Sequence, residues 1–256
     1  MIKFFRRIRR RLLTESKPAS RSGKFGRYLL YAIGETLLVV VGILIALQVN
    51  RQNDFQNNRK QEQTILNNIL RDLSTDHSEL RKNIAYTQYH LSVLDTMLRE
   101  ISFNPNYKIV DFARHNGNFP YHEIFAISKG TYMENLSSGK ISLILSDSLR
   151  EEIFQYYELR IKDIGADIAV IATMNSIMPI WYDILGPSQE FSLGLGLSTN
   201  LPNLVLEEIA ANPKYQVILM QKYAILGGQI EDWNQFKSIN EHLVQSIERE
   251  LKARWK

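Results

Sequence analysis

The chain contains no cysteine, and it lacks any block of sequence typical of a β-rich domain. Without cysteine no disulfide framework can form, and this absence fits a reducing and an oxidising compartment equally well. Without strand-like blocks, the 256 residues are expected to fold as α-helices, in one or two domains. The composition therefore leaves the compartment open and points to an all-α protein.

A complete catalytic or nucleotide-binding motif is also missing. Residues 137–140, SSGK, fail as a phosphate-binding loop because Glu134 stands at the first glycine position and Ile141 follows the lysine. Ser137 and Lys140 match the S-x-x-K of serine acyl-transferases, but the third element, K-T-G, and its sheet are not visible. We therefore expect that the protein is not an enzyme.

Metal and cofactor motifs are equally incomplete. The pair His122-Glu123 does not extend to the zinc motif H-E-x-x-H, because Ala126 stands where the second histidine is needed. His115 and His122 share one region of the chain, but no third ligand is indicated. The GLGL of residues 194–197 has neither a preceding strand nor the third glycine of a dinucleotide fingerprint. We expect no metal and no cofactor.

Acidic residues are scarce in the N-terminal tail. Residues 1–27 hold ten Lys or Arg and one acid, Glu15, so of the chain's 31 basic and 27 acidic residues, 21 and 26 remain elsewhere. The alkaline isoelectric point is thus a property of the tail, and nucleic acid is not an expected partner. Residues 2–13 form either an amphipathic helix on the inner leaflet, through Ile2, Phe5, Ile8 and Leu12, or a disordered positive tag.

A single long apolar run follows the basic tail. From Tyr28 to Val49 the strongly polar residues are Glu35, Thr36 and Gln48, and these 22 residues exceed the roughly 20 that cross a bilayer core. This pattern favours an uncleaved signal-anchor. A cleaved signal peptide and a buried core helix are the alternatives, although the sequence ALQ at 46–48 is a poor cleavage site.

The flanking cations predict the orientation of this span. Ten lie before it, whereas Arg51, Arg59 and Lys60 are those in the first dozen residues after it. By the positive-inside rule we expect a single-pass protein of the bacterial inner membrane, with a cytoplasmic N-terminus and a periplasmic C-terminal domain. The expected parts are a basic tail (1–27), a transmembrane helix (28–49), a polar stalk (50–65) and an extracytoplasmic helical bundle (66–256).

Glu35 is an unusual residue within the expected span. On a helix it shares a stripe with Gly42 and Ala46, a small-xxx-small pair that lets a neighbouring backbone come close. A polar partner at this depth would satisfy the carboxyl group. The alternative is that Glu35 reaches back to the cytoplasmic interface. We therefore treat Glu35, Gly42 and Ala46 as a candidate intramembrane contact.

A seven-residue repeat begins beyond the stalk and predicts a coiled-coil seam. One row of this seam contains His77 and the other contains Thr87, and the remaining nine positions are aliphatic. These aliphatic positions are Leu66, Leu70, Leu73, Leu80, Ile84, Leu91, Leu94, Leu98 and Ile101.

Further helices are predicted along the rest of the chain. After a loop from 103 to about 120, we expect a short helix over His122–Leu136, which Gly139 ends in a left-handed turn. A long helix should begin at a capping box of Ser148 and Glu151, with Ile168 and Ile171 on its apolar face. Residues 191–202 should form a loop, and a short helix should cover 203–211.

The last long helix is predicted to open at Asn212-Pro213. Gly227-Gly228 would interrupt it, either as a hinge or as a point of close helix contact. Three long amphipathic helices can bury their faces against one another. The predicted fold is therefore all-α, with one N-terminal transmembrane helix followed by an antiparallel coiled-coil or helical bundle.

Several stretches, taken together, resemble a known family. They are MIKFFRRIRR, then GKFGRYLLYAIGETLLVVVGILIALQVN, then LSSGKISLI leading to IFQYYELR, and ERELK. They resemble uncharacterised single-span membrane proteins of Bacteroidota, classed as a domain of unknown function, most specifically over residues 23–50. The Trp-containing N.WN usual after the span is replaced here by NRQN at 50–53. The resemblance implies a membrane address, an envelope setting and a helical exterior, but no activity, cofactor or site residue.

Two roles remain open from the sequence. The first is an interaction or scaffold protein whose partners are the lipid bilayer and a second protein or a second copy, held through the span and the helical arm. The second is a sensory or ligand-binding ectodomain, because helical bundles can hold pockets between helices. A tail of 27 residues is too short for an output domain, so such a sensor would signal through a separate membrane partner.

Overall fold

The computed structural model describes residues 23–162, 165–186, 188–194 and 200–255. Within these ranges the chain is helical and forms no β-strand. It divides into two compact units, Met1–Arg59 and Lys60–Lys256, which we treat separately. The predicted amphipathic helix at 2–13 lies outside the described residues.

The helices occur in the following order along the chain. They are α2 (Gly23–Phe103), α3 (Ile109–Asn116), α4 (Gly130–Ser137), the 3-10 helix η1 (Lys140–Leu143), α5 (Asp147–Lys162), α6 (Gly165–Leu185), α7 (Gln189–Gly194), α8 (Leu206–Ala211) and α9 (Pro213–Arg254). Helix α2 ends at the FNPN sequence, as predicted, and it includes the polar residues expected to form a stalk.

Two described helices are long and apolar enough to cross a membrane, the N-terminal part of α2 and α6. In the first unit, every residue of α2 from Tyr31 to Asn50 is exposed. Helix α6 differs because its row Val170, Met174 and Ile177 is buried within the second unit. The buried row identifies α6 as a core helix, whereas among the described residues no protein core covers the exposed apolar surface of α2.

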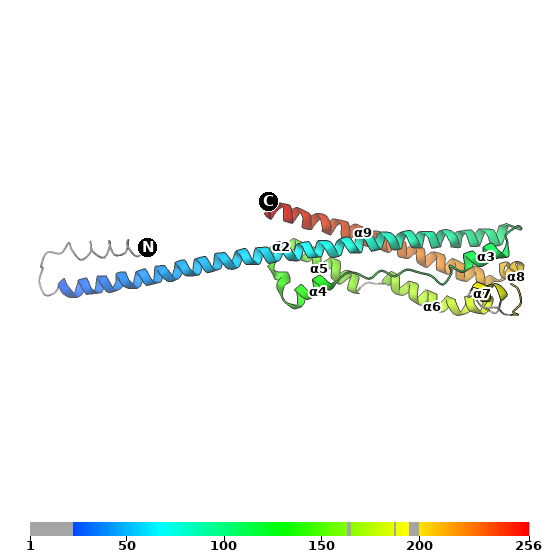
Figure 1. Cartoon of the computed structure of the whole chain (residues 1–256), viewed down its shortest axis with the longest axis horizontal. Coiled ribbons are helices and arrows are strands. Elements are labelled where there is room, and N and C mark those ends of the chain that lie inside the picture. The colour runs from blue at the N-terminus through cyan, green and yellow to red at the C-terminus, as the bar shows by residue number, and fades with distance from the viewer. Residues whose placement is uncertain (1–22, 163–164, 187, 195–199, 256) are drawn as a thin grey trace. The chain divides into compact units, whose positions relative to one another are not determined.

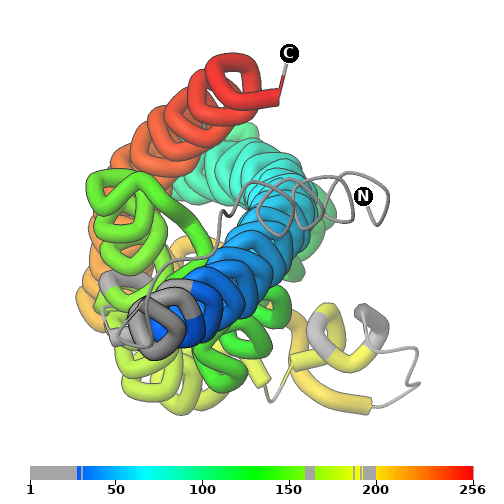
Figure 2. The backbone as a smooth tube through the Cα atoms, turned by 90° about the vertical axis from the view of Figure 1, so that its left-hand side faces the viewer, coloured from blue at the N-terminus to red at the C-terminus, as the bar shows by residue number. Residues whose placement is uncertain are grey.

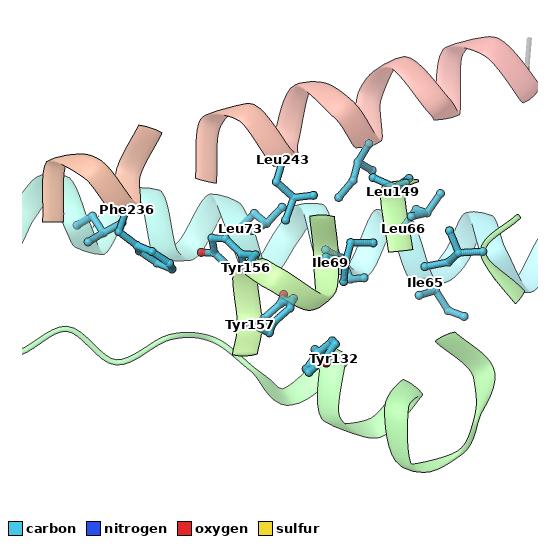
Figure 3. Close-up of a cluster of buried hydrophobic side chains, with 14 of the residues drawn as sticks. Ile65, Leu66, Ile69, Leu73, Tyr132, Leu149, Tyr156, Tyr157, Phe236 and Leu243 are labelled. Atoms are coloured by element: carbon cyan, nitrogen blue, oxygen red, sulfur yellow. The ribbon is translucent and has the colours of Figure 1, made fainter. Parts of the chain in front are cut away.

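The second unit packs α2, α5, α6 and α9 side by side. Figure 1 shows α9 running back along the later part of α2 and crossing it in this view, with α5 and α6 below α2, and Figure 2 shows these helices end-on. Two groups of buried side chains hold them together. The first core cluster (Figure 3) includes Leu66, Ile69, Leu73, Tyr132, Tyr156, Tyr157, Phe236 and Leu243. The second includes Leu94, Phe112, Phe119, Trp181, Tyr215 and Leu219.

The predicted start of the last helix is confirmed. The Asn212 side chain accepts a hydrogen bond from the backbone N–H of Lys214 at 3.0 Å, and Pro213 occupies the first helical position. Gly227 and Gly228 do not interrupt α9, and a Cβ on either would meet nothing within 4 Å. The predictions of a hinge and of close helix contact at these glycines are therefore wrong for the described chain.

The start of α5 differs from the predicted capping box. The backbone N–H of Leu149 donates to Ser146 Oγ at 3.3 Å, so the helix is capped two residues before Ser148. Glu151 accepts instead from Gln155, one turn along the helix. Gly139 follows the prediction, because its φ of 71° places it in the left-handed region after α4.

Three predicted segments are corrected by the structure. Residues 122–129 of the expected helix at His122–Leu136 are not helical, and α4 supplies only its end. Helix α3 occupies part of the expected loop before 120, and α7 occupies part of the expected loop at 191–202. In the first case the backbone groups bond to side chains of other helices, so they are not available for helical hydrogen bonds. The short helix predicted over 203–211 is confirmed as α8.

The apolar face predicted for α5 and α6 is also partly wrong. Ile168 and Ile171 are exposed, and the buried row of α6 lies at Val170, Met174, Ile177 and Trp181 instead. Asp167 also belongs to this buried row. A prediction that counts aliphatic residues alone leaves out the row that contains Asp167, and it therefore places the buried face on the wrong side of α6. The adjacent residues Tyr156 and Tyr157 of α5 are both fully buried.

Candidate functional site

The second unit buries polar residues in a regular row on α2. Counting in sevens from Glu62 gives Ile69, Asp76, Asn83, His90 and Met97, all buried. Four of these six side chains are polar or charged. Because burying a polar group without a hydrogen bond is costly, such a row predicts specific partners elsewhere in the unit.

Two of these partners, Ile124 and Ser128, lie in one extended segment, residues 119–129, which we call the strap. The strap connects the end of α3 to α4 and has no regular secondary structure from Tyr121 onward. Phe119 stacks on Trp181 in the second core cluster, with ring centroids 5.6 Å apart. Phe125 enters the first core cluster, 5.7 Å from the ring of Phe236. The strap therefore joins the two clusters through these aromatic side chains.

Helix α2 holds the second half of the strap. Asp76 Oδ1 accepts a hydrogen bond from the backbone N–H of Ser128 at 2.8 Å. Asn83 Nδ2 donates to the carbonyl of Ile124 at 3.3 Å. Farther along the same row, Glu62 Oε1 accepts from the backbone N–H of Leu145 at 2.8 Å. The polar row thus satisfies backbone groups that have no helix or sheet of their own.

Helix α9 holds the first half of the strap. Lys222 Nζ donates to the carbonyls of Phe119 and Tyr121, the latter at 2.9 Å. Gln229 Nε2 donates to the carbonyl of Glu123 at 2.9 Å and to Asp167 Oδ1 at 2.8 Å. The strap is therefore bonded to α2 and to α9, and through Gln229 it is linked to α6.

A second buried network surrounds Asp76. Tyr156 donates its hydroxyl proton to Asp76 Oδ2 at 2.8 Å, and Asn240 Nδ2 donates to the hydroxyl oxygen of Tyr156 at 3.0 Å. Burial raises the pKa of Asp76, while the bonds from Ser128 and Tyr156 lower it in part. Burial together with the charge of Asp76 raises the pKa of Tyr156 far above its ordinary value. The carboxyl group therefore acts as an acceptor that ties α2, α5, α9 and the strap together.

The electrostatics are most unusual around Lys222, which is 1% exposed. Burial lowers the pKa of its ammonium to about 7. His90 is 7% exposed on the facing row of α2. Burial and then the charge of Lys222 lower the pKa of His90, whereas Glu123 raises it. Two bases that ordinarily carry or acquire protons near neutral pH are thus held where the neutral form is favoured.

A shallow groove lies on the outer side of the strap. It has a volume of about 590 Å³ and lies between α2 and the strap, where its lining includes Ser78, Glu79, Lys82, Asn83, Glu123 and Ile124. Most of these groups are polar, and both signs of charge are present. The groove can accept a polar ligand, but its open form provides little enclosure.

The candidate contact predicted within the apolar helix lies in the first unit. Glu35, Gly42 and Ala46 are exposed on α2, and a Cβ at Gly42 would meet nothing within 4 Å. The hydroxyl of Thr36 donates to the carbonyl of Ala32 at 2.9 Å, within the helix. No contact of the three candidate residues is needed for the fold of this unit.

The leucines of the predicted seam lie in the second unit and are buried to different extents. Leu66, Leu73, Leu80, Ile84 and Leu94 are buried, and so is Thr87. Leu70, Leu91, Leu98 and Ile101 are partly buried and pack against the two core clusters. Burial is deepest on two rows of α2, the row of Leu66 and the polar row. The buried face of α2 is therefore centred between these two rows.

The residues considered for catalysis and metal binding are not brought together. Ser137 Oγ donates to the carbonyl of Glu134 at 3.0 Å, and Lys140 is exposed. His115 Nδ1 lies 2.8 Å from the hydroxyl of Tyr107, whereas His122 Nδ1 lies 3.3 Å from the carbonyl of Pro120. Across the described part of the chain, no three His, Asp or Glu side chains gather as metal ligands.

Comparison with known families identifies the class of the chain. A model of a family of unknown function, DUF6090, matches residues 35–164, and the chain belongs to this family. The matched region covers the polar row of α2, the strap and all of α5. Searches of curated proteins and of solved structures returned no match.

Sequence reasoning missed the residues that hold the strap. Lys222 and Gln229 stand one heptad apart on α9, each four residues before a position on its apolar stripe, Leu226 and Trp233 respectively. Asp76, Asn83 and His90 interrupt a row of α2 in the same way. The sequence did contain a signal, namely a charged or amide residue at a position where the helical repeat predicts burial. Its partner lies on a segment without regular structure, and periodicity does not predict that partner.

Proposed function

We propose that the protein is a membrane-anchored interaction protein of the bacterial envelope, without enzymatic activity. The observation that carries this proposal is the exposed apolar surface of α2 from Tyr31 to Val49. A helix that is apolar all round requires either a protein core or lipid around it, and the described part of the chain places no core over this one. The bilayer is therefore the proposed environment of the span.

The proposed topology has a cytoplasmic tail and a periplasmic second unit, supported by the basic residues before the span. The signature of residues 23–50 supports an origin in Bacteroidota. The helices of the second unit would present an antiparallel bundle to a partner, and the heptad row that begins at Leu66 supports a coiled-coil type of packing.

The absence of natural cysteine allows a direct test of this topology. Single variants Ser20→Cys, in the tail, and Ser238→Cys, on the exposed side of α9, are treated with a membrane-impermeant maleimide. With the outer membrane permeabilised, we expect labelling of the second variant in whole cells and of the first only after lysis. Labelling of the tail before lysis, or release of the chain by a carbonate wash, contradicts the proposal.

The proposed contact within the membrane uses the face of Glu35, Gly42 and Ala46. The partner is a second copy or another membrane helix whose polar group satisfies the carboxyl of Glu35. A photo-cross-linker at Gly42 should capture this helix, and Glu35→Leu should reduce the capture. The matched control is Thr36→Val, because the Thr36 hydroxyl is already bonded within its own helix. Equal capture by the wild-type chain and Glu35→Leu rejects this contact.

A second candidate function is a sensory or ligand-binding ectodomain that signals through a separate membrane partner. The polar groove between α2 and the strap favours it, because a ligand there would contact both elements at once. Metabolite mixtures are added to the full-length protein in detergent micelles, and its melting temperature is measured. A ligand of the groove should raise it, and the increase should be lost in Glu79→Ala, whose side chain lines the groove.

A further inference from the structure

Lys222 is a buried base whose partners are uncharged. Its Nζ donates to the carbonyls of Phe119 and Tyr121 and lies 4.8 Å from the centroid of the Phe119 ring. Among the described residues, it makes no ion pair with a carboxylate. Carbonyl dipoles and an aromatic face replace only part of the hydration that an ammonium loses on burial.

His90 is a second base beside the same part of the strap. It is buried, and its Nδ1 has no hydrogen-bond partner in the described chain. The charged and titratable groups around it come from several elements. They are Lys222 on α9, with His122 and Glu123 on the strap. Asp167 on α6 reaches the strap indirectly, through its bond to Gln229.

These two bases favour opposite protonation states with the strap in place and with the strap released. While the strap covers them, burial favours the neutral amine of Lys222 and the neutral imidazole of His90. Once the strap leaves, water reaches both groups and their ordinary affinity for protons returns. Proton uptake is therefore coupled to release of the strap.

We propose that Lys222 and His90 form a proton-controlled latch, which holds the first half of the strap against α2 and α9 while both bases are neutral and frees it as they take up protons. The second half, held by Asp76 and Asn83, stays bound to α2. Release would expose the inner side of residues 119–124 and uncouple α9 from the strap. This latch does not depend on the proposed membrane topology.

The expected pH dependence follows from linkage. Lys222 has a lowered pKa, so the stability it gives the closed strap is full above its ordinary pKa of 10.5. This stability falls as the pH decreases toward about 7 and is constant below that value. His90 adds a further loss as the pH falls below its ordinary pKa of 6.5. Acidification therefore opens the strap in two steps.

Hydrogen exchange on the full-length protein in dodecyl maltoside micelles can measure this opening. The reporters are the backbone amides of Phe119 and Tyr121, which donate to the carbonyls of Asn116 and Asn118 beneath Lys222. Protection is expressed as the ratio of intrinsic to observed exchange rate, which removes the direct effect of pH on exchange chemistry. Between pH 8.5 and 7 we expect the protection of these amides to fall by roughly tenfold.

The variants separate the two bases. In Lys222→Met the fall between pH 8.5 and 7 should disappear, and in His90→Gln the additional fall below pH 6.5 should disappear. The matched controls are Lys252→Met, whose side chain is 80% exposed on the same helix, and His77→Gln, which pairs with Glu241. Both controls should retain the wild-type pH dependence.

Clear results would overturn the latch. Protection of Phe119 and Tyr121 that stays constant from pH 8.5 to 5 in the wild-type chain rejects it, even if Lys222→Met does not fold. An unchanged pH dependence in a folded Lys222→Met variant rejects the role of Lys222. If core amides at Ile69 and Leu73 lose protection in parallel, the whole unit unfolds and no separate latch exists.

Discussion

The hydroxyl of Tyr156 donates a hydrogen bond to Asp76 at 2.8 Å, across 80 residues of sequence. Its neighbour Tyr157 is buried to the same degree, but its hydroxyl has no hydrogen-bond partner among the described residues. Two adjacent tyrosines therefore contribute to the first core cluster in different ways. One supplies a bond between helices, and the other supplies packing area against the ring of Tyr132.

This difference predicts opposite results for the same substitution. Tyr156→Phe leaves Asp76 Oδ2 without its donor and one N–H of Asn240 without its acceptor, so it should lower the free energy of unfolding by about 1–3 kcal/mol. Tyr157→Phe removes a buried hydroxyl without a partner and should be neutral or slightly stabilising. Urea unfolding followed by circular dichroism measures both. Equal losses in the two variants would contradict the assigned hydrogen bonds.

Replacement of Asp76 tests the junction between the helices and the strap. Asp76→Ala leaves the Ser128 N–H and the Tyr156 hydroxyl without their acceptor, so we expect a loss of about 2–5 kcal/mol in the free energy of unfolding. Asp76→Asn keeps one acceptor oxygen and should lose less. Chemical denaturation at pH 7 distinguishes them, and a loss in Asp76→Ala no larger than in Asp76→Asn would contradict this role.

The Asp76→Asn variant also has a predicted pH dependence. The folded pKa of Asp76 is raised above 3.8 by burial, so the wild-type chain loses stability as the pH rises through that folded pKa and the carboxyl group ionises. An amide does not ionise. The stability of Asp76→Asn relative to the wild-type chain should therefore increase between pH 4 and 7. A difference that is independent of pH would show that burial does not disfavour the carboxylate.

Two glycines give a matched pair for backbone effects. Gly139 has a φ of 71°, so Gly139→Ala should cost roughly 1–2 kcal/mol through backbone strain, although nothing lies within 4 Å of the added Cβ. Gly228 lies inside α9 with equally open surroundings, so Gly228→Ala should stabilise the protein by about 0.5–1 kcal/mol. Thermal unfolding measures both shifts. A stabilising Gly139→Ala would contradict the left-handed turn.

The cap of α9 can be tested at one position. Asn212→Ala removes the acceptor for the Lys214 N–H and should cost about 1 kcal/mol, whereas Asn212→Ser keeps a capping oxygen and should cost less. The difference is measured by urea unfolding. If both variants lose the same free energy, the side chain does not cap this helix in solution.

Local sequence signals and the heptad repeat correctly predicted the features that depend on neighbouring residues. The end of α2 at FNPN, the left-handed Gly139 and the opening of α9 at Asn212-Pro213 each follow from the residues at that point. Leu66, Leu73 and Leu80 could be predicted as a row because aliphatic side chains repeat there every seven residues.

Partners that are distant in sequence explain the rest. The helix expected at His122 does not form, because Asp76 and Gln229 bond its backbone groups from helices far away in the chain. The buried row of Asp76, Asn83 and His90 was passed over for the more aliphatic row of Leu70 and Leu91. Burial of a polar side chain depends on a partner, and periodicity carries no information about that partner.

The polar row of α2 has a consequence for the alignment of the helices. A seam of leucines repeated every seven residues is nearly unchanged when one helix slides by a heptad, so apolar packing alone leaves several alignments close in energy. Asp76 accepts from Ser128 on the strap and from Tyr156 on α5, and Asn83 donates to Ile124 on the strap. A slide of one heptad would leave both buried groups unpaired at once. Misaligned pairings of these helices are thereby excluded, and the polar residues distinguish the native alignment from its neighbours.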